Sequence, residues 1–242
     1  MNATAEPPAQ KSDAEFDRFA TNYDEALQQG LAVSGESKEY FATGRIQFLK
    51  NCLEKLAFTP SLAFDFGCGT GTSVPLLHQL PGVKKVTGTD LSIESITQAQ
   101  QLHAHPDRQF VPLTEFKPEG DFDLAFCNGV FHHIPVAVRP EAVATVFRSL
   151  KPGGIFAFWE NNPWNPATRY VMSRIPFDRD AITLTPRESR NLLKQAGFEV
   201  LRTDYLFIFP KFLKWCRPLE TVISSWPLGT QYQVLCRKPL TT

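Results

Sequence analysis

One glycine-rich motif stands out in this sequence: Phe64-Asp65-Phe66-Gly67-Cys68-Gly69-Thr70-Gly71. The apolar run that leads into it has the length of a buried strand, and a helical pattern follows it. Glycine lets the chain turn tightly and lets its backbone approach a bound molecule. The motif therefore predicts a ligand-binding loop at the carboxyl end of a strand. For the glycines taken alone, an ordinary tight turn explains them equally well.

An acidic residue follows this loop at a distance typical of nucleoside-binding proteins. Asp90 ends the next apolar run, Val86-Thr87-Gly88-Thr89-Asp90-Leu91, nineteen residues after Gly71. A carboxylate at that position accepts hydrogen bonds from the hydroxyls of an adenosine ribose. The strand, the glycine loop and Asp90 together predict a nucleoside site at the carboxyl edge of a sheet.

The rest of the chain predicts an α/β fold. Two helical patterns, near 16–27 and 41–56, precede the first strand. From Leu62 onward, apolar runs of strand length alternate with helical patterns, which is typical of βαβ units and a parallel sheet. We expect a doubly wound sheet of seven strands. The predicted strands are 62–66, 84–90, 109–113, 122–127, 154–160, 198–208 and 230–237.

We expect a disordered tail over 1–12 and a single domain over 13–242, in which 13–58 form an amino-terminal helical cap. Residues 161–184 show no clear period and are too long for an ordinary connection, so we interpret them as a cap inserted after the fifth strand. Residues 209–229 are a second irregular stretch. A turn is predicted at 151–154, and a capping box at Thr185 predicts a helix from 186 onward.

The charge balance and the cysteine content argue against some kinds of partner and binding site. The 25 Lys and Arg balance the 25 Asp and Glu, which disfavours a nucleic-acid partner. The five cysteines show no metal-ligand spacing, so we expect reduced thiols, a cytoplasmic protein and no metal site. We find neither a secretory signal nor an apolar run long enough to span a bilayer. Peripheral membrane contact through 205–215 remains compatible with the sequence, and the oligomeric state is undetermined.

Three motifs together resemble the class I S-adenosylmethionine-dependent methyltransferases. They are the glycine loop with Asp90, residues 122–134, which are similar to the family's fourth-strand motif, and residues 150–154, which are similar to the turn before its fifth strand. The resemblance covers about 60–200 and is closest to the small-molecule branch of ubiquinone and menaquinone biosynthesis enzymes. It implies S-adenosyl-L-methionine as the cofactor and an antiparallel last strand in a mostly parallel sheet.

The resemblance also implies roles for individual residues. The glycines match the loop under the methionine part of the cofactor, Asp65 matches the acidic residue that orders this loop, and Asp90 matches the ribose ligand. After the third strand, the usual adenine ligand is missing, so we assign adenine contact to Leu113 and Thr114, with Glu115 as the alternative. The expected cofactor-binding residues are Tyr23, Asp65, Gly67, Cys68, Gly69, Gly71, Asp90, Leu91, Leu113, Thr114, Asn128 and Gly129.

Two histidines are the first candidates for a general base. His132 and His133 follow the fourth strand, close to the expected methyl group, and histidine titrates near neutrality. Packing of the loop is the competing explanation. Arg45 either reaches the cofactor carboxylate or lies on a solvated helix face. Glu160, Asn161 and Asn162 either hold the acceptor or cap the loop after the fifth strand.

We therefore expect in-line transfer of a methyl group to an oxygen, nitrogen or sulfur of a small molecule. Acceptors that fit are a phenol or quinone-like compound, a lipid or sugar intermediate, and a small thiol. The alternatives are a nicotinamide-dependent oxidoreductase on the same fold and a non-catalytic, cofactor-binding partner protein.

Overall fold

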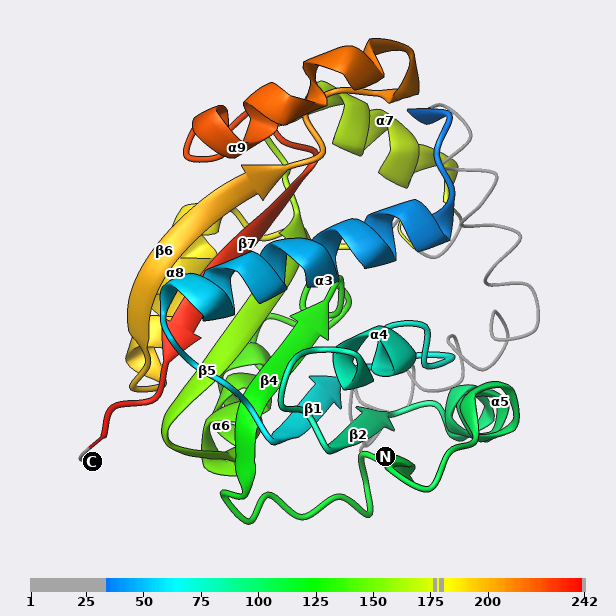
Figure 1. The fold of residues 1–242 in the computed structure, drawn as a ribbon, viewed down its shortest axis with the longest axis vertical. Coiled ribbons are helices and arrows are strands. Elements are labelled where there is room, and N and C mark those ends of the chain that lie inside the picture. Colours follow the sequence, from blue (N-terminus) through cyan, green and yellow to red (C-terminus); the bar gives the residue numbers. More distant parts are fainter. Residues whose placement is uncertain (1–33, 176–177, 179–180, 241–242) are drawn as a thin grey trace, which may run out of the picture.

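A seven-stranded sheet forms the centre of the molecule. The computed structural model describes residues 34–175, 178 and 181–240. The strand order is β3-β2-β1-β4-β5-β7-β6, and β7 runs antiparallel to both neighbours, as predicted (Figure 1). The strands are β1 Leu62–Phe66, β2 Lys85–Asp90, β3 Arg108–Pro112, β4 Phe122–Asn128, β5 Leu150–Asn161, β6 Glu199–Leu206 and β7 Gln231–Arg237.

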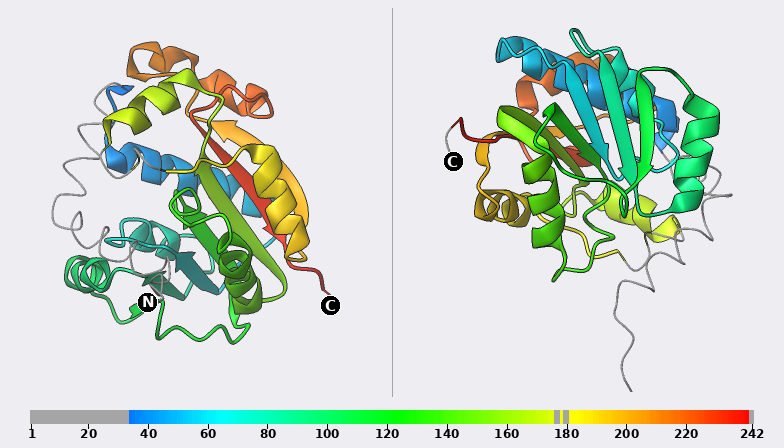
Figure 2. Two further views of the ribbon diagram at one scale, coloured as in Figure 1. Left: turned by 180° about the vertical axis from the view of Figure 1, so that it is seen from behind. Right: turned by 90° about the horizontal axis from the view of Figure 1, so that it is seen from below.

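Helices cover both faces of the sheet (Figure 2). One face carries α3 Lys38–Lys55, α4 Val74–His78 and α5 Ile93–His103, and the other carries α6 Arg139–Ser149 and α8 Pro186–Gln195. Three further helices, α7 Pro166–Arg174, η3 Lys211–Leu219 and α9 Glu220–Ile223, lie beyond the strand ends at the top of Figure 1.

Burial of both faces explains why the central strands β1, β4 and β5 are apolar along most of their length. Neighbouring residues point to opposite faces, so Trp159 packs in the core beneath α3, whereas Phe158 packs in the core beneath α6 and α8. Each face thus has its own apolar core, and the sheet is held rigidly between them.

The strand order indicates where a ligand binds. It reverses between β1 and β4, and in open α/β sheets ligands bind outside the carboxyl ends of the strands at such a reversal. The glycine loop leaves β1 at this point, and Asn128 ends β4 beside it.

The prediction of a turn at 151–154 was wrong. These residues belong to β5, where Leu150 pairs with Phe122 before the register shifts to Leu124 and Ile155. Gly153 has a positive φ of 81° inside this irregularity. A bulge uses the same residue types as a turn, so the local sequence does not separate them.

The stretches 161–184 and 209–229 are more regular than predicted. Asn165 begins α7 by accepting hydrogen bonds from the amides of Ala167 and Thr168. The second stretch contains η3 and α9. The chain leaves β6 at Leu206 rather than 208, because Phe207 has a φ of 60°.

The capping box of α8 is present, with Thr185 and Glu188 exchanging hydrogen bonds. The predicted tail at 1–12, the helix near 16–27 and Tyr23 lie outside the described residues. Within the described part of the chain, no helix is both long and apolar enough to cross a membrane.

Candidate functional site

The glycine loop is fastened to the end of β2. The amides of Gly67 and Cys68 both donate to the carbonyl oxygen of Thr89, at 2.8 Å each. Gly67 has a positive φ, and a Cβ atom there would lie 2.4 Å from Cγ2 of Val130. At Gly69 an added Cβ would meet nothing within 4 Å. The loop is therefore tightly packed at its start and open at Gly69, as a cradle for a ligand must be.

Asp90 connects the loop to α5. Its Oδ2 atom accepts a 2.9 Å hydrogen bond from the amide of Gly69, and its Oδ1 atom accepts one from Ser92 at 3.0 Å. The amide of Leu113 donates to the carbonyl oxygen of Asp90 at 2.8 Å. The ends of β1, β2 and β3 thus meet here, as the sequence predicts.

The side chains at the carboxyl ends of the strands differ in how exposed they are. Leu91 is 48 % exposed, Thr114 is exposed, and Leu113 and Asn128 are half-buried. An exposed leucine beside Asp90 offers an apolar surface to a flat ring. The structure thus brings the predicted ribose and adenine ligands to one edge.

Asp65 is buried beneath the loop. Its Oδ2 atom has no hydrogen-bond partner among the described residues. Burial and the neighbouring charge of Asp90 raise the pKa of Asp65 to about 8, although Arg45 opposes the shift. Arg45 is itself buried and donates to Oε1 of Gln231 at 2.9 Å, so the solvated interpretation of Arg45 was wrong.

His132 lies between two carboxylates. Its Nδ1 atom is 2.6 Å from Oε2 of Glu160, and its Nε2 atom is 3.5 Å from Oδ1 of Asp178. Burial alone lowers the pKa of His132, but the two carboxylates outweigh it and raise the pKa to about 10. His132 is therefore an imidazolium at neutral pH, with both ring nitrogens facing acceptors.

His133 has the opposite electrostatics. Its Nε2 atom lies 3.3 Å from Oδ1 of Asp178. Burial and the charge of His132 lower the pKa of His133, although Asp178 opposes the shift. Asp178 is an ionised carboxylate, because hydrogen bonds from the two histidines outweigh its burial and hold its pKa at about 2. The two histidines thus occupy different charge states at neutral pH.

This cluster adjoins the end of β4. The amide of Gly129 donates to the carbonyl oxygen of Trp159 at 3.0 Å, and a Cβ at Gly129 would lie 3.5 Å from Cε1 of His132. Asn162 donates to the carbonyl oxygens of Gly229 and Pro227, so its side chain caps the loop.

Sequence analysis missed Asp178. It lies 45 residues beyond His133 in the inserted stretch, and nothing in its local sequence marks it as a histidine partner. Glu160 was expected to face the acceptor or cap the loop, but its carboxylate binds His132 and the amide of Phe131.

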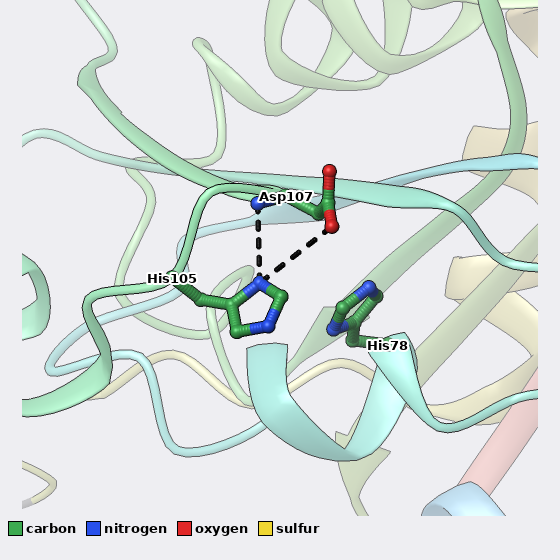
Figure 3. Close-up of side chains that lie close together, drawn as sticks. All are labelled: His78, His105 and Asp107. Atoms are coloured by element: carbon green, nitrogen blue, oxygen red, sulfur yellow. Dashed lines mark hydrogen bonds and ion pairs between the residues drawn. The ribbon is translucent and has the colours of Figure 1, made fainter.

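The structure also assembles metal-ligand types that the sequence pattern did not reveal. His132, His133 and Asp178 form one such group, and His78, His105 and Asp107 form another, with the ligand atoms of each group within 4.8 Å of one another. Figure 3 shows the second group, where Nδ1 of His105 accepts a 3.1 Å hydrogen bond from the amide of Asp107. It lies between the end of α4 and the start of β3, at the edge opposite the glycine loop.

The match to known proteins agrees with this architecture. Residues 64–156, which run from β1 through the glycine loop, Asp90 and the histidine pair into β5, match the family model for a methyltransferase domain. Residues 64–156 therefore resemble a methyltransferase domain. The small-molecule branch that the sequence motifs indicate also fits the relatives below.

Curated relatives resemble part of this chain. Trans-aconitate 2-methyltransferase of Escherichia coli O157:H7 is 32% identical over 158 residues, which are 60% of this chain and 60% of that protein. The chain thus spans about 60% of the length of the curated relatives it matches.

Solved structures share the fold of this chain over nearly its whole length. An S-adenosylmethionine-dependent methyltransferase from Thermotoga maritima has a TM-score of 0.65 at 17% identity, covering 94% of this chain and 99% of that one. A TehB-like methyltransferase from Corynebacterium glutamicum has a TM-score of 0.56 at 20% identity, covering 93% and 98%.

Proposed function

We propose that this protein transfers a methyl group from S-adenosyl-L-methionine to a small molecule. The observation that carries the proposal is the hydrogen bond between Gly69 and Asp90, which joins the glycine loop to the expected ribose ligand at the reversal of strand order. The match of 64–156 to a methyltransferase domain supports it. Relatives and fold neighbours that carry this name support the same class of reaction.

The described residues fit this cofactor. The open space above Gly69 leaves room for a ligand on the loop, and the carboxylate of Asp90 lies beside it. The Oδ2 atom of Asp65 has no hydrogen-bond partner among the described residues, so this buried carboxyl group is left to pair with a bound ligand. We assign ribose binding to Asp90, adenine contact to Leu91 and Leu113, and the methyl-donor surroundings to Asn128 and Gly129.

S-adenosyl-L-methionine, when bound, supplies a methyl group that is already activated on a sulfonium. The residues of this chain then have to align the acceptor, exclude water and remove a proton where the acceptor carries one.

We assign proton removal to His133. A lowered pKa keeps its imidazole neutral at neutral pH, which is the state that accepts a proton. Because Nε2 faces Asp178, we place the ring hydrogen on Nε2 and the basic lone pair on Nδ1. His132 is a positioning residue, since its charged ring anchors Asp178 and is itself anchored by Glu160.

A neutral base favours an acceptor that arrives protonated. Phenols, alcohols and thiols lose a proton during methylation, whereas a carboxylate is already ionised near neutral pH. We therefore propose a small phenol, alcohol or thiol as the acceptor. Trans-aconitate, the acid named in the curated relatives, would need no base and is the contrasting case.

The test is transfer of label from methyl-labelled S-adenosyl-L-methionine to a small-molecule extract, followed by separation into organic, aqueous and volatile products. The Asp90→Ala variant is the negative control. We expect label in a product only with the unchanged protein. Cofactor binding without transfer to any fraction would favour a non-catalytic partner protein, and binding of a nicotinamide cofactor instead would favour an oxidoreductase.

A further inference from the structure

Five large apolar side chains between 212 and 226, in the second irregular stretch, are exposed to water. They follow one another at intervals of three or four residues along η3, α9 and the turn after α9, and η3 is a 3₁₀ helix with a kink at Leu213. All five are 57–77 % exposed. We call them the apolar stripe, and they are Phe212, Trp215, Leu219, Val222 and Trp226.

The helices that carry the stripe are fixed by their other side. Arg217 donates to Oε1 of Glu36 at 2.7 Å and lies over the ring of Tyr40, while Glu220 accepts a hydrogen bond from the amide of Phe209. Ser224 donates to the buried carboxylate of Asp204. These polar contacts hold η3 and α9 with the stripe facing outward, so the stripe is not an unpacked part of the core.

The fold does not use the stripe. Neither η3 nor α9 contains a buried residue, and the two apolar cores of the sheet are formed by other elements. A contiguous set of exposed aromatic and aliphatic side chains is unusual on a soluble surface and marks a contact site.

The residue types in and beside the stripe indicate which kind of surface it binds. Tryptophan is enriched where one end of a side chain is apolar and the other is wet, as at the headgroup level of a bilayer. Lys211 and Lys214 are exposed immediately beside Phe212 and Trp215, and lysines beside a short apolar helix face are attracted to anionic lipid.

A protein partner fits the stripe less well. A stable dimer buries about 20–30 residues on each side, whereas the stripe offers five side chains. A short amphipathic helix that lies in the headgroup region needs no larger area.

We propose that the apolar stripe, with Lys211 and Lys214, binds the surface of an anionic phospholipid bilayer. Four residues of the stripe lie on η3 and α9, and Trp226 follows α9; both helices lie beyond the carboxyl ends of the parallel strands, the same end of the sheet that carries the glycine loop (Figure 1). The inference rests on exposure and charge alone and does not depend on the methyltransferase activity.

The test is co-sedimentation of the full chain with phosphatidylcholine vesicles, with and without phosphatidylserine. We expect binding to the anionic vesicles, a blue shift of tryptophan emission and quenching by brominated lipid. The double variant Trp215→Glu and Trp226→Glu should weaken the partition by about tenfold or more. The double variant Lys211→Gln and Lys214→Gln should weaken it about thirtyfold on anionic vesicles and have little effect on neutral ones.

The matched control is Leu102→Glu on α5, a comparably exposed leucine away from the cap. It should bind vesicles like the unchanged chain. All variants should unfold at the same temperature, because none of the changed side chains is buried.

Three results would overturn the proposal. Unchanged protein that stays in solution with both kinds of vesicle is the first. Trp215 and Trp226 that are shielded from acrylamide without lipid would show that another part of the chain covers the stripe. A dimer in light scattering that the tryptophan variants abolish, without vesicle binding, would assign the stripe to a second copy.

Discussion

The Nδ1 atom of His132 lies 2.6 Å from Oε2 of Glu160, and both side chains are almost completely buried. A charged pair in this setting is costly to break, because removal of one partner leaves the other buried and uncompensated. The pair also gives the two histidines different charge states, because it keeps His132 charged beside a neutral His133.

Glu160→Gln should lower the free energy of unfolding at neutral pH by about 3–5 kcal/mol. The pKa of His132 is raised from 6.5 to about 10, so its stabilisation is complete below pH 6.5 and is lost as the pH rises through 10. The gap between variant and unchanged protein in urea unfolding should therefore shrink as the pH rises from about 6.5 to 10 and level off above 10. Glu141→Gln, which breaks an exposed pair with Arg148, should cost at most about 1 kcal/mol.

His133→Ala should slow methylation of a phenol or alcohol by about 10²–10⁴-fold at neutral pH, because the acceptor then loses its proton without a base. In the unchanged protein, the rate should fall as the pH drops below the pKa of His133, which lies under its usual value. The variant should lose this dependence. An acceptor carboxylate methylated at the same rate by both proteins would refute the base assignment for that substrate.

Asp90→Ala should weaken cofactor binding by about 1–3 kcal/mol in calorimetry, because the ribose hydroxyls lose their acceptor and the amide of Gly69 loses its partner. Asp107→Ala is the matched control, since Asp107 is an exposed aspartate at the opposite edge of the sheet. Equal affinities for the Asp90 variant and the unchanged protein would remove Asp90 from the site.

Gly67→Ala should destabilise the protein by more than Gly69→Ala. Both positions have a positive φ, but only at Gly67 does an added Cβ collide, at 2.4 Å from Val130. We expect about 1 kcal/mol for the strained backbone at Gly69 and about 1–3 kcal/mol more at Gly67. Adding Val130→Ala should recover part of the extra loss. Purely additive effects in this double-mutant cycle would show that the two side chains do not meet.

Asp65→Asn should become more stable relative to the unchanged protein as the pH rises from about 4 to 8. The folded pKa of Asp65 is about 8 against an ordinary 3.8, so the folded protein retains a proton that the unfolded chain loses. The free energy of unfolding of the unchanged protein therefore falls over this window and levels off above it.

Asp123 offers the reverse case, because Lys151 and two backbone amides lower its pKa. Asp123→Asn should lose stability over the pH range where Asp123 ionises.

Much of the fold was predictable because it is encoded locally. The central strands, which are buried on both faces, appear as continuous apolar runs, and the other strands contain shorter ones; all seven were found within a few residues of their observed ends. The error at 151–154 came from a bulge, which depends on how β5 pairs with β4. The helix α7 was missed because its capping residue, Asn165, lies among prolines and other asparagines that also favour loops.

The sequence by itself determined the glycine loop, Asp90 and their meeting at the sheet edge, since spacing along two parallel strands is enough to bring their carboxyl ends together. It also marked the histidine pair. Only the tertiary structure decided which histidine is charged and that Arg45 is buried. It alone also showed that the apolar stripe faces water. A pKa and an exposed surface depend on what packs from distant parts of the chain, such as Asp178 against His132, and no local pattern carries that information.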